Sequence, residues 1–227
     1  LFSTICRFKG MKPKLFLIDG FSLIFRSYWA FIHNPVRNPE GRNVSAVFGF
    51  FSTLISLIGK HSPENLVIVL DSPVPTFRHL MYPEYKANRD KAPDDLHDQV
   101  PVIKEFLSIL GLKILSSDGY EADDLMACAA RKGDNSGYSS YIISADKDLM
   151  QVVNNNIHML RPEKGEYLDI GPEEVFEKMG VRPDQIIDYL SLIGDSADNI
   201  PGVRGIGPKT AVTLLQKFET LDGIYEN

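Results

Sequence analysis

The sequence predicts an α/β protein whose mostly parallel central sheet is flanked by helices. Three runs of strand length consist mainly of consecutive apolar residues rather than alternating ones, as in strands that helices cover on both faces: residues 14–18, 66–70 and 141–145. Helical patterns are expected between and around these runs, at residues 44–58, 98–110 and 121–131. Strands that alternate with helices indicate a sheet with crossover connections.

The other segments add elements and interrupt this plan twice. Residues 112–115 and 157–160 are weaker strand candidates. Residues 72–97 combine prolines, aromatic rings and bases, which indicates a partly helical insertion. From residue 171 onward the strands stop, and three short helices are expected, at residues 172–179, 183–193 and 209–218.

This pattern predicts three parts of the chain. Residues 1–10 precede Met11 and are interpreted as an N-terminal extension, because they are too short and too mixed for a secretory signal. Residues 11–170 form the core, with the insertion at about 72–97, and residues 171–227 form a small helical module.

Composition excludes several classes of protein. With 227 residues, 44% of them apolar, the chain can bury a core and is not intrinsically disordered. Its two cysteines, Cys6 and Cys128, exclude a disulfide scaffold and favour a reducing, cytoplasmic setting. The longest apolar-rich stretch, residues 47–58, is shorter than the roughly 20 residues of a membrane helix, so no membrane association is expected.

Carboxylates gather where ligands bind in open parallel sheets, beyond the carboxyl ends of the strands. Asp19, Asp71 and Asp146 each follow an apolar run. Further acids open a helix, follow Asp146 by two residues, or lie three apart and so on one face if helical. The full candidate set is Asp19, Asp71, Glu121, Asp123, Asp124, Asp146, Asp148, Asp195 and Asp198.

A single acid of this kind is most simply a helix cap or a turn residue. The nine together are not, because crowded like charges destabilise a fold unless a cation neutralises them. Without these nine acids the net charge would change from −6 to +3. Carboxylate ligands favour Mg²⁺ or Mn²⁺, and their number fits two or more ions of the kind that assist phosphoryl chemistry.

A glycine-rich turn at residues 202–211 predicts a phosphate-binding site. It resembles a P-loop, but Pro208 stands where that motif needs lysine, and no strand is expected before it. The better match is a turn between two helices, where free N–H groups and a lysine can hold a nucleic-acid backbone. An ordinary helical hairpin is the simpler alternative. The residues assigned to DNA binding here are Gly202, Arg204, Gly205, Gly207, Lys209 and Thr210.

The insertion interleaves bases with aromatic rings, a combination that suits single-stranded nucleic acid. A solvated surface loop would explain any one of these residues, but less well their position directly after the acidic Asp71. The residues singled out are Phe77, Arg78, Tyr85, Lys86 and Arg89.

Seven motifs resemble, in order, the 5′-nuclease domain at the N-terminus of bacterial DNA polymerase I, of the flap endonuclease superfamily. They lie at residues 17–20, 70–78, 83–89, 119–124, 145–149, 194–202 and 205–211, and the resemblance covers about residues 13–222. It implies a PIN-like α/β domain, a helical arch at the insertion and a helix-three-turn-helix module at the C-terminal end.

The resemblance also implies roles for the site residues. Asp19, Asp71, Glu121 and Asp123 match the group that binds a metal more tightly. A second group is matched by Asp146, Asp148, Asp195 and Asp198, and Asp124 lies between the two. Lys86 and Arg89 match arch residues that contact the scissile phosphate, and residues 202–211 match a duplex-binding turn that also holds K⁺.

Two departures from the family accompany this resemblance. Phe21 stands where a small or polar residue is expected. The family domain continues for several helices beyond the position of Asn227, so the DNA-binding module is expected to be truncated.

We therefore expect a structure-selective 5′→3′ exonuclease and 5′-flap endonuclease that hydrolyses DNA with two metal ions, in replication and repair. The expected partner is DNA with a 5′ flap or 5′ end, RNA-primed DNA included. The protein is expected to be a monomer in the bacterial cytoplasm, associated with the nucleoid, with attachment to a polymerase domain left open. Two alternatives remain: a non-catalytic DNA-binding module, and a phosphatase with an aspartate nucleophile, which Phe21 disfavours because an acid is expected there.

Overall fold

The computed structural model describes residues 12–89, 91–163 and 165–227. The predicted N-terminal extension, residues 1–10, lies outside the described residues. No helix in the described part of the chain is long and apolar enough to cross a membrane.

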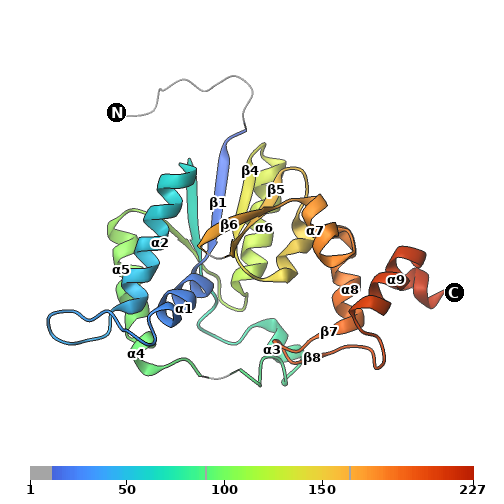
Figure 1. Ribbon diagram of the computed structural model, residues 1–227, viewed down its shortest axis with the longest axis horizontal. Coiled ribbons are helices and arrows are strands. Elements are labelled where there is room, and N and C mark those ends of the chain that lie inside the picture. Colours follow the sequence, from blue (N-terminus) through green and yellow to red (C-terminus); the bar gives the residue numbers. More distant parts are fainter. Residues whose placement is uncertain (1–11, 90, 164) are drawn as a thin grey trace.

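A six-stranded sheet forms the centre of the molecule, with strand order β3-β2-β1-β4-β5-β6 (Figure 1). All neighbouring strands of this sheet are parallel except β5 and β6, which pair antiparallel. The strands are β1 (Lys14–Asp19), β2 (Asn65–Val69), β3 (Lys113–Leu115), β4 (Ser139–Ile143), β5 (Ile157–Glu163) and β6 (Glu166–Ile170). The predicted mostly parallel sheet is confirmed.

Helices cover both faces of the sheet, because alternate side chains of a strand point to opposite faces. Phe16 and Ile18 of β1 pack in one buried cluster, and Leu17 packs in the other. Against the first face lie α1 (Gly20–Ala30), α2 (Ser45–His61) and α5 (Gln99–Ile109). Against the second lie α6 (Ala122–Asn135), η1 (Lys147–Val152) and α7 (Pro172–Met179).

The C-terminal helices continue the second cluster. They are the short η2 (Pro183–Gln185), α8 (Ile186–Ile193), α9 (Pro208–Phe218) and α10 (Leu221–Tyr225). Tyr189, Ala211 and Leu215 belong to the same buried cluster as Leu17 of β1. The helical module is therefore packed onto the sheet domain, and Figure 1 shows it extending from α7 toward the C-terminus.

Among its described residues, the insertion contains two short helices, α3 (Phe77–Met81) and α4 (Asp94–His97), and is otherwise irregular. Figure 1 shows it running beneath the edge where β1 and β2 end. This path places the basic segment over the predicted carboxylate site.

The structure differs from the expected elements in several places. Helices α1, η1 and α10 and strand β6 were not predicted, and β4 ends at Ile143, two residues before the end of the predicted run. The expected end of strands at residue 171 is wrong, because β7 (Gly194–Asp195) and β8 (Ile200–Pro201) form a small antiparallel hairpin. Asp195 and Asp198 consequently lie on a hairpin turn, not on one face of a helix.

Candidate metal and nucleic-acid site

The first group of acids is fixed by the sheet and by the start of α6. Asp19 ends β1 and caps α1, where its Oδ1 accepts a hydrogen bond of 2.9 Å from the backbone N–H of Ser22. The Ser144 hydroxyl donates to the other Asp19 oxygen at 3.0 Å. Asp71 follows β2 and accepts from the backbone N–H of Ala122 at 2.7 Å. That bond ties the end of β2 to the helix that carries Asp123.

The second group lies on turns. Asp146 caps η1 and accepts a hydrogen bond of 2.9 Å from the N–H of Asp148. Asp195 begins the β7–β8 turn and accepts from the N–H of Ala197 at 2.8 Å. Asp198 lies on the same turn, three residues on.

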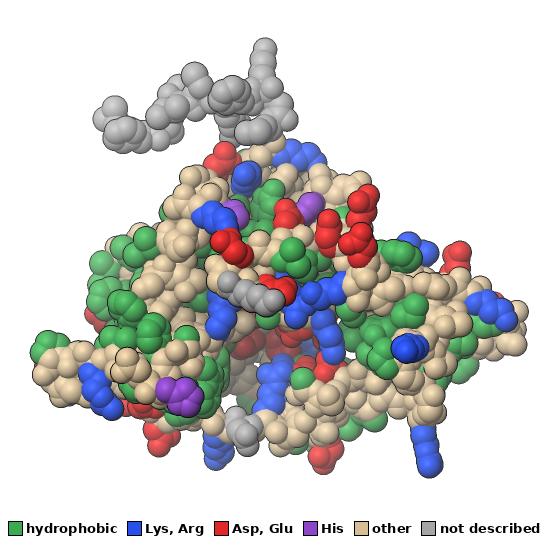
Figure 2. Space-filling model, viewed as in Figure 1, with side chains coloured by type: hydrophobic (Ala, Val, Ile, Leu, Met, Phe, Trp, Pro, Cys, Tyr) green, Lys and Arg blue, Asp and Glu red, His purple; other side chains and the backbone are tan. Residues whose placement is uncertain are grey.

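The structure brings the acids from these separate segments around two adjoining cavities. The larger, of about 690 Å³, is lined by six of the nine predicted acids: Asp19, Asp71, Asp123, Asp146, Asp195 and Asp198. The other, of about 550 Å³, is lined by Glu121, Asp124 and Asp148 and shares Asp123, Asp195 and Asp198 with the first. Figure 2 shows acidic and basic side chains meeting around a hollow in the middle of the molecule.

Burial and mutual repulsion make several of these carboxylates reluctant to ionise. Burial raises the pKa of Asp123 to about 8, with the charges of Asp146, Asp19 and Asp71 adding to it. The pKa of Asp19 rises to about 6, and that of Asp148 rises to about 6, again chiefly through burial. One oxygen of Asp148 is buried without a hydrogen-bond partner in the described residues. Such a set fits divalent cations, which would compensate the buried negative charge.

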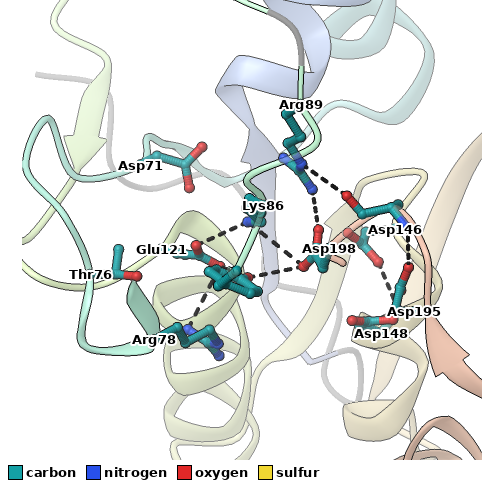
Figure 3. Close-up of polar contacts among 12 residues, drawn as sticks. Asp71, Thr76, Arg78, Lys86, Arg89, Glu121, Asp146, Asp148, Asp195 and Asp198 are labelled. Atoms are coloured by element: carbon teal, nitrogen blue, oxygen red, sulfur yellow. Dashed lines mark hydrogen bonds and ion pairs between the residues drawn. The ribbon is translucent and has the colours of Figure 1, made fainter. Parts of the chain in front are cut away.

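Lysine and arginine side chains hold part of the acid set. Lys86 Nζ lies 2.9 Å from Glu121 Oε1 and 3.9 Å from Asp198 Oδ2. Arg89 pairs with Asp198, and Lys147 Nζ lies 3.1 Å from Asp195 Oδ2. Figure 3 shows Lys86 and Arg89 reaching from the insertion to these acids, with Asp71 lying apart from the ion pairs.

These pairings change what the sequence predicts for the site. As the side chains lie, no group of three or more acid, histidine or cysteine side chains within the described residues stands ready to hold an ion. The acids are gathered, but several carboxylates turn toward lysine and arginine because unlike charges attract and like charges repel. Ion binding would require these pairs to exchange partners.

Asp124 differs from the other eight acids. Its two oxygens accept a pair of 2.7 Å hydrogen bonds from the guanidinium of Arg78. One of them also accepts from the N–H of Glu121 at 3.0 Å, which caps α6. Burial alone would raise the pKa of Asp124, but the bonds from Arg78 and Glu121 outweigh it and the pKa lies below its usual range. Both of its oxygens are thus engaged without an ion.

Tyr85 lies in an environment that the sequence did not suggest. Its side chain is buried, at 5% exposed, and its hydroxyl lies 2.8 Å from Glu121 Oε2 and 3.0 Å from Asp198 Oδ2. Burial, followed by the bond to Glu121, raises the pKa of Tyr85. Placed this way, the ring does not offer a face to a base. Phe77 is the more accessible of the two rings, at 40% exposed.

The glycine-rich turn connects the hairpin to α9. Arg204, Lys209 and Thr210 are exposed, and Gly207 precedes α9 with Pro208 in its first turn. Gly205 has a φ of +87°, which glycine adopts without strain. At Gly202 glycine is required by close packing, because a Cβ there would lie 2.3 Å from the carbonyl carbon of Ile193.

Two residues next to the acids were missed by sequence reasoning. Ser144 orients Asp19, and Lys147 pairs with Asp195. A signal was available for both: a serine stands at the second-to-last position of the third apolar run, and a lysine lies between two acids at residues 146–148. Arg161 and Phe25 also line the larger cavity.

Comparison with known proteins gives family matches from residue 14 to residue 227. The N-terminal resolvase-like domain of 5′-3′ exonucleases matches residues 14–180, and their C-terminal SAM fold matches residues 181–227. The expected α/β fold with a C-terminal helical module is confirmed.

Relatives and a solved structure agree with these matches. DNA polymerase I of Borreliella burgdorferi is 48% identical over 214 residues, covering 94% of this chain and 24% of that protein. The 5′-3′ exonuclease of Aquifex aeolicus is 43% identical over 213 residues, covering 94% of this chain and 72% of that protein. A structure of the bacteriophage T5 flap endonuclease with DNA and metal ions has a TM-score of 0.76 at 23% identity, covering 95% of this chain and 79% of that one.

The relatives differ in how much of their own length this chain matches. The chain spans about a quarter of the length of the DNA polymerase I relatives, at 24% and 22% of the first two. It spans 72% of the Aquifex aeolicus exonuclease at 43% identity, and the two domain matches together cover residues 14–227. The chain therefore belongs to the 5′-3′ exonuclease family.

Proposed function

We propose that this chain is a divalent-metal-dependent 5′-nuclease that hydrolyses DNA phosphodiester bonds at 5′ ends and 5′ flaps. The observation that carries the proposal is the convergence of acids from β1, β2, α6, η1 and the β7–β8 turn on adjoining cavities, beneath a segment with Lys86 and Arg89. Membership of the 5′-3′ exonuclease family supports the direction of the reaction.

Eight acids would hold the ions, in two groups. Asp19, Asp71, Glu121 and Asp123 form the group on the sheet and α6, and Asp146, Asp148, Asp195 and Asp198 form the group on the turns. Asp124 would support the site by holding Arg78 and capping α6. Two bound Mg²⁺ or Mn²⁺ ions would supply the Lewis acid that phosphodiester hydrolysis needs.

Lys86 and Arg89 would orient the reacting phosphate. Both already reach the acids, and their positive charges would stabilise the negative charge that develops on the phosphate oxygens in the transition state. Before that, each must leave its carboxylate partner for the phosphate. Phe77, Arg78 and Tyr85 belong to the same insertion, and Phe77 would stack on a base of the single strand.

Residues 202–210 would hold the duplex through its backbone. Arg204 and Lys209 are exposed on the turn before α9 and at its start, where N–H groups are free to bind phosphate. A K⁺ ion would sit on the carbonyl groups of this turn. In this division residues 11–170 would carry most of the chemistry, and residues 171–227 would add Asp195 and Asp198 to the metal site and hold the duplex.

The relatives indicate the setting of the reaction. Several of them are DNA polymerases I in which the matched region is a small part of a longer chain. We propose that the protein acts in the bacterial cytoplasm during replication and repair, as a monomer or joined to a polymerase domain.

The test is cleavage of an end-labelled 5′-flap duplex in Mg²⁺, with and without EDTA. We expect cuts near the junction that leave a 5′-phosphate and that EDTA abolishes. The Glu105→Gln variant, which changes an exposed acid of α5, should match the wild type, and Asp71→Asn should be inactive. Binding without cleavage in both Mg²⁺ and Mn²⁺ would make the chain a DNA-binding module. Cleavage of a small phosphate ester but not of DNA would make it a phosphatase.

A further inference from the structure

Two segments that lie more than 100 residues apart in the chain are joined beside the acid site. They are residues 84–89 of the insertion and residues 196–199 of the β7–β8 turn, and together they form a unit that we call the latch. Four hydrogen bonds to backbone carbonyl groups join them: Lys86 N to Asp198 O at 3.0 Å, Asn88 Nδ2 to Ser196 O at 2.8 Å, Arg89 Nε to Ala197 O at 3.4 Å, and Asn199 Nδ2 to Glu84 O at 2.7 Å.

The latch holds the backbone of Lys86 in a conformation that it would not choose alone. Lys86 has a φ of +57°, in the left-handed region that most residues with a Cβ rarely adopt, and Asn199 has a φ of +60°, which asparagine adopts more readily. Such residues persist where surrounding contacts determine them, and they concentrate at functional sites. Here the contacts are the hydrogen bonds of the latch.

Closure of the latch decides where Lys86 and Arg89 point. With the segments joined, Lys86 contacts Glu121 and Asp198, and Arg89 pairs with Asp198 (Figure 3). The side chains of Lys86 and Asp198 are only 19% and 18% exposed, so water screens this contact little. An ion at Glu121 and Asp198, or a phosphate at Lys86 and Arg89, must replace these pairs.

We propose that Asn88 and Asn199 are positioning residues that keep the latch closed, so that the ligand-free protein occupies its own acids with its own phosphate-binding cations. The latch then competes with both ligands, the divalent ion and the nucleic-acid phosphate. Whichever ligand binds first opens the latch and leaves less for the second to displace, so each strengthens the binding of the other by the same factor. This inference rests on the proposed metal site.

The test compares the wild-type chain with Asn88→Ala/Asn199→Gly, in which glycine keeps the positive φ while the side-chain bond to Glu84 is lost. Asn38→Ala, at an asparagine of another exposed loop, is the control. Without ion or DNA, amide hydrogen exchange across residues 84–89 should be faster in the double variant only. Mn²⁺ without DNA, titrated by calorimetry, should bind the double variant about fivefold more tightly, the effect of losing two exposed hydrogen bonds at the low end of their usual strength. The affinity of the double variant for a 5′-overhang duplex in EDTA, measured by fluorescence anisotropy, should increase by a similar factor.

The outcomes separate the latch from the metal site. If amide hydrogen exchange at residues 84–89 is unchanged in the double variant, the proposed role of the two asparagines in closing the latch is wrong. If Mn²⁺ affinity is equal or weaker in the double variant, the proposed competition between the latch and the ion is wrong. A wild type that binds no Mn²⁺ overturns the proposed function and the coupling with it, while the exchange result still judges the latch. Asn88→Ala alone, at an exposed side chain, should show a smaller change in the same direction, and it replaces the double variant if that one unfolds.

Discussion

The acids of the sheet edge and the acids of the hairpin turn reach the same cavity by different means. Asp19 and Asp71 follow buried strands, and their oxygens accept bonds from backbone N–H groups or a serine hydroxyl. Asp195 and Asp198 lie on the hairpin, where Asp195 accepts one backbone N–H from Ala197 and the other side-chain partners are Lys147, Lys86, Arg89 and Tyr85. The sheet acids are therefore positioned before any ligand arrives, while the hairpin acids must first exchange partners.

This difference predicts an order of sensitivity. A preorganised carboxylate contributes its full interaction energy when the ion binds, because little free energy is needed to move it into place. A carboxylate that is already paired with lysine or arginine contributes only the difference between the free energy of binding the ion and that of the pair it gives up. Four substitutions test this order.

The largest effect is expected from Asp71→Asn at the sheet edge. The amide keeps the oxygen that accepts from Ala122, so the fold should persist while the charge is lost. We expect Mg²⁺-dependent flap cleavage to fall at least about 10³-fold, the loss of roughly 4 kcal/mol of transition-state stabilisation. The measurement is single-turnover cleavage with Glu105→Gln as control. A loss under tenfold would mean that the sheet edge is not the centre of the chemistry.

Gly194→Ala should disrupt the hairpin itself. Gly194 has a φ of +74°, and a Cβ there would lie 2.3 Å from the backbone nitrogen of Gly202. We expect the free energy of unfolding to fall by about 3 kcal/mol, from backbone strain and overpacking together. Urea denaturation measures this. Gly59→Ala, in α2 with open space around it, should leave stability equal or up to about 1 kcal/mol higher.

Asp198→Asn should cost less activity than Asp71→Asn. Removing the charge also releases Lys86 and Arg89, which offsets part of the lost ion affinity. We expect cleavage at low Mg²⁺ to fall roughly 10- to 100-fold, as for groups that tune a metal site, and to recover partly at high Mg²⁺. Asp222→Asn, in the C-terminal helix α10, is the matched control. A loss as large as that of Asp71→Asn, without recovery at high Mg²⁺, would show that the hairpin acids matter as much for ion binding as the acids of the sheet edge.

The smallest effect is expected from Lys147→Met, and its sign is the informative part. Burial lowers the pKa of Lys147, but the hydrogen bond to Asp195 and the charges of nearby acids raise it by more, so the pKa lies above its usual value. The Lys147–Asp195 pair is therefore attractive. Its side chain is 38% exposed, so the pair is screened and holds Asp195 by at most about 1 kcal/mol. Mn²⁺ should bind the variant up to about fivefold more tightly by calorimetry, with Lys132→Met unchanged. Weaker binding would show that Lys147 orients Asp195 for the ion.

Sequence reasoning succeeded where one local pattern carried the information. The sheet was predictable because β1, β2 and β4 each contain at least three consecutive apolar residues, which is typical of strands covered on both faces. The position of Asp19 and Asp71 followed, since the carboxyl ends of parallel strands share one edge. Helix α1 was missed although its buried residues, Leu23, Ile24, Ser27 and Tyr28, have helical spacing, and the residue that caps it, Asp19, was interpreted as a metal ligand.

The hairpin was beyond the reach of local patterns. Two acids three residues apart fit a helix as well as a turn, and the contact of Gly194 with Gly202 decides for the turn. Tyr85 was predicted to be a stacking ring because it lies among bases and prolines. It is buried because the insertion folds onto Glu121 and Asp198, which lie 36 and 113 residues away along the chain.

The sequence by itself determined which chemical groups this protein assembles: carboxylates after buried strands, bases in an insertion, and a glycine turn before a helix. Hydrophobic periodicity is written locally, and it places those groups at known ends of known elements. Only the tertiary structure decided which carboxylates are paired with lysine or arginine and which are not. Ion pairs and hydrogen bonds between segments 35 to 113 residues apart depend on how the backbone returns on itself, which no local pattern records.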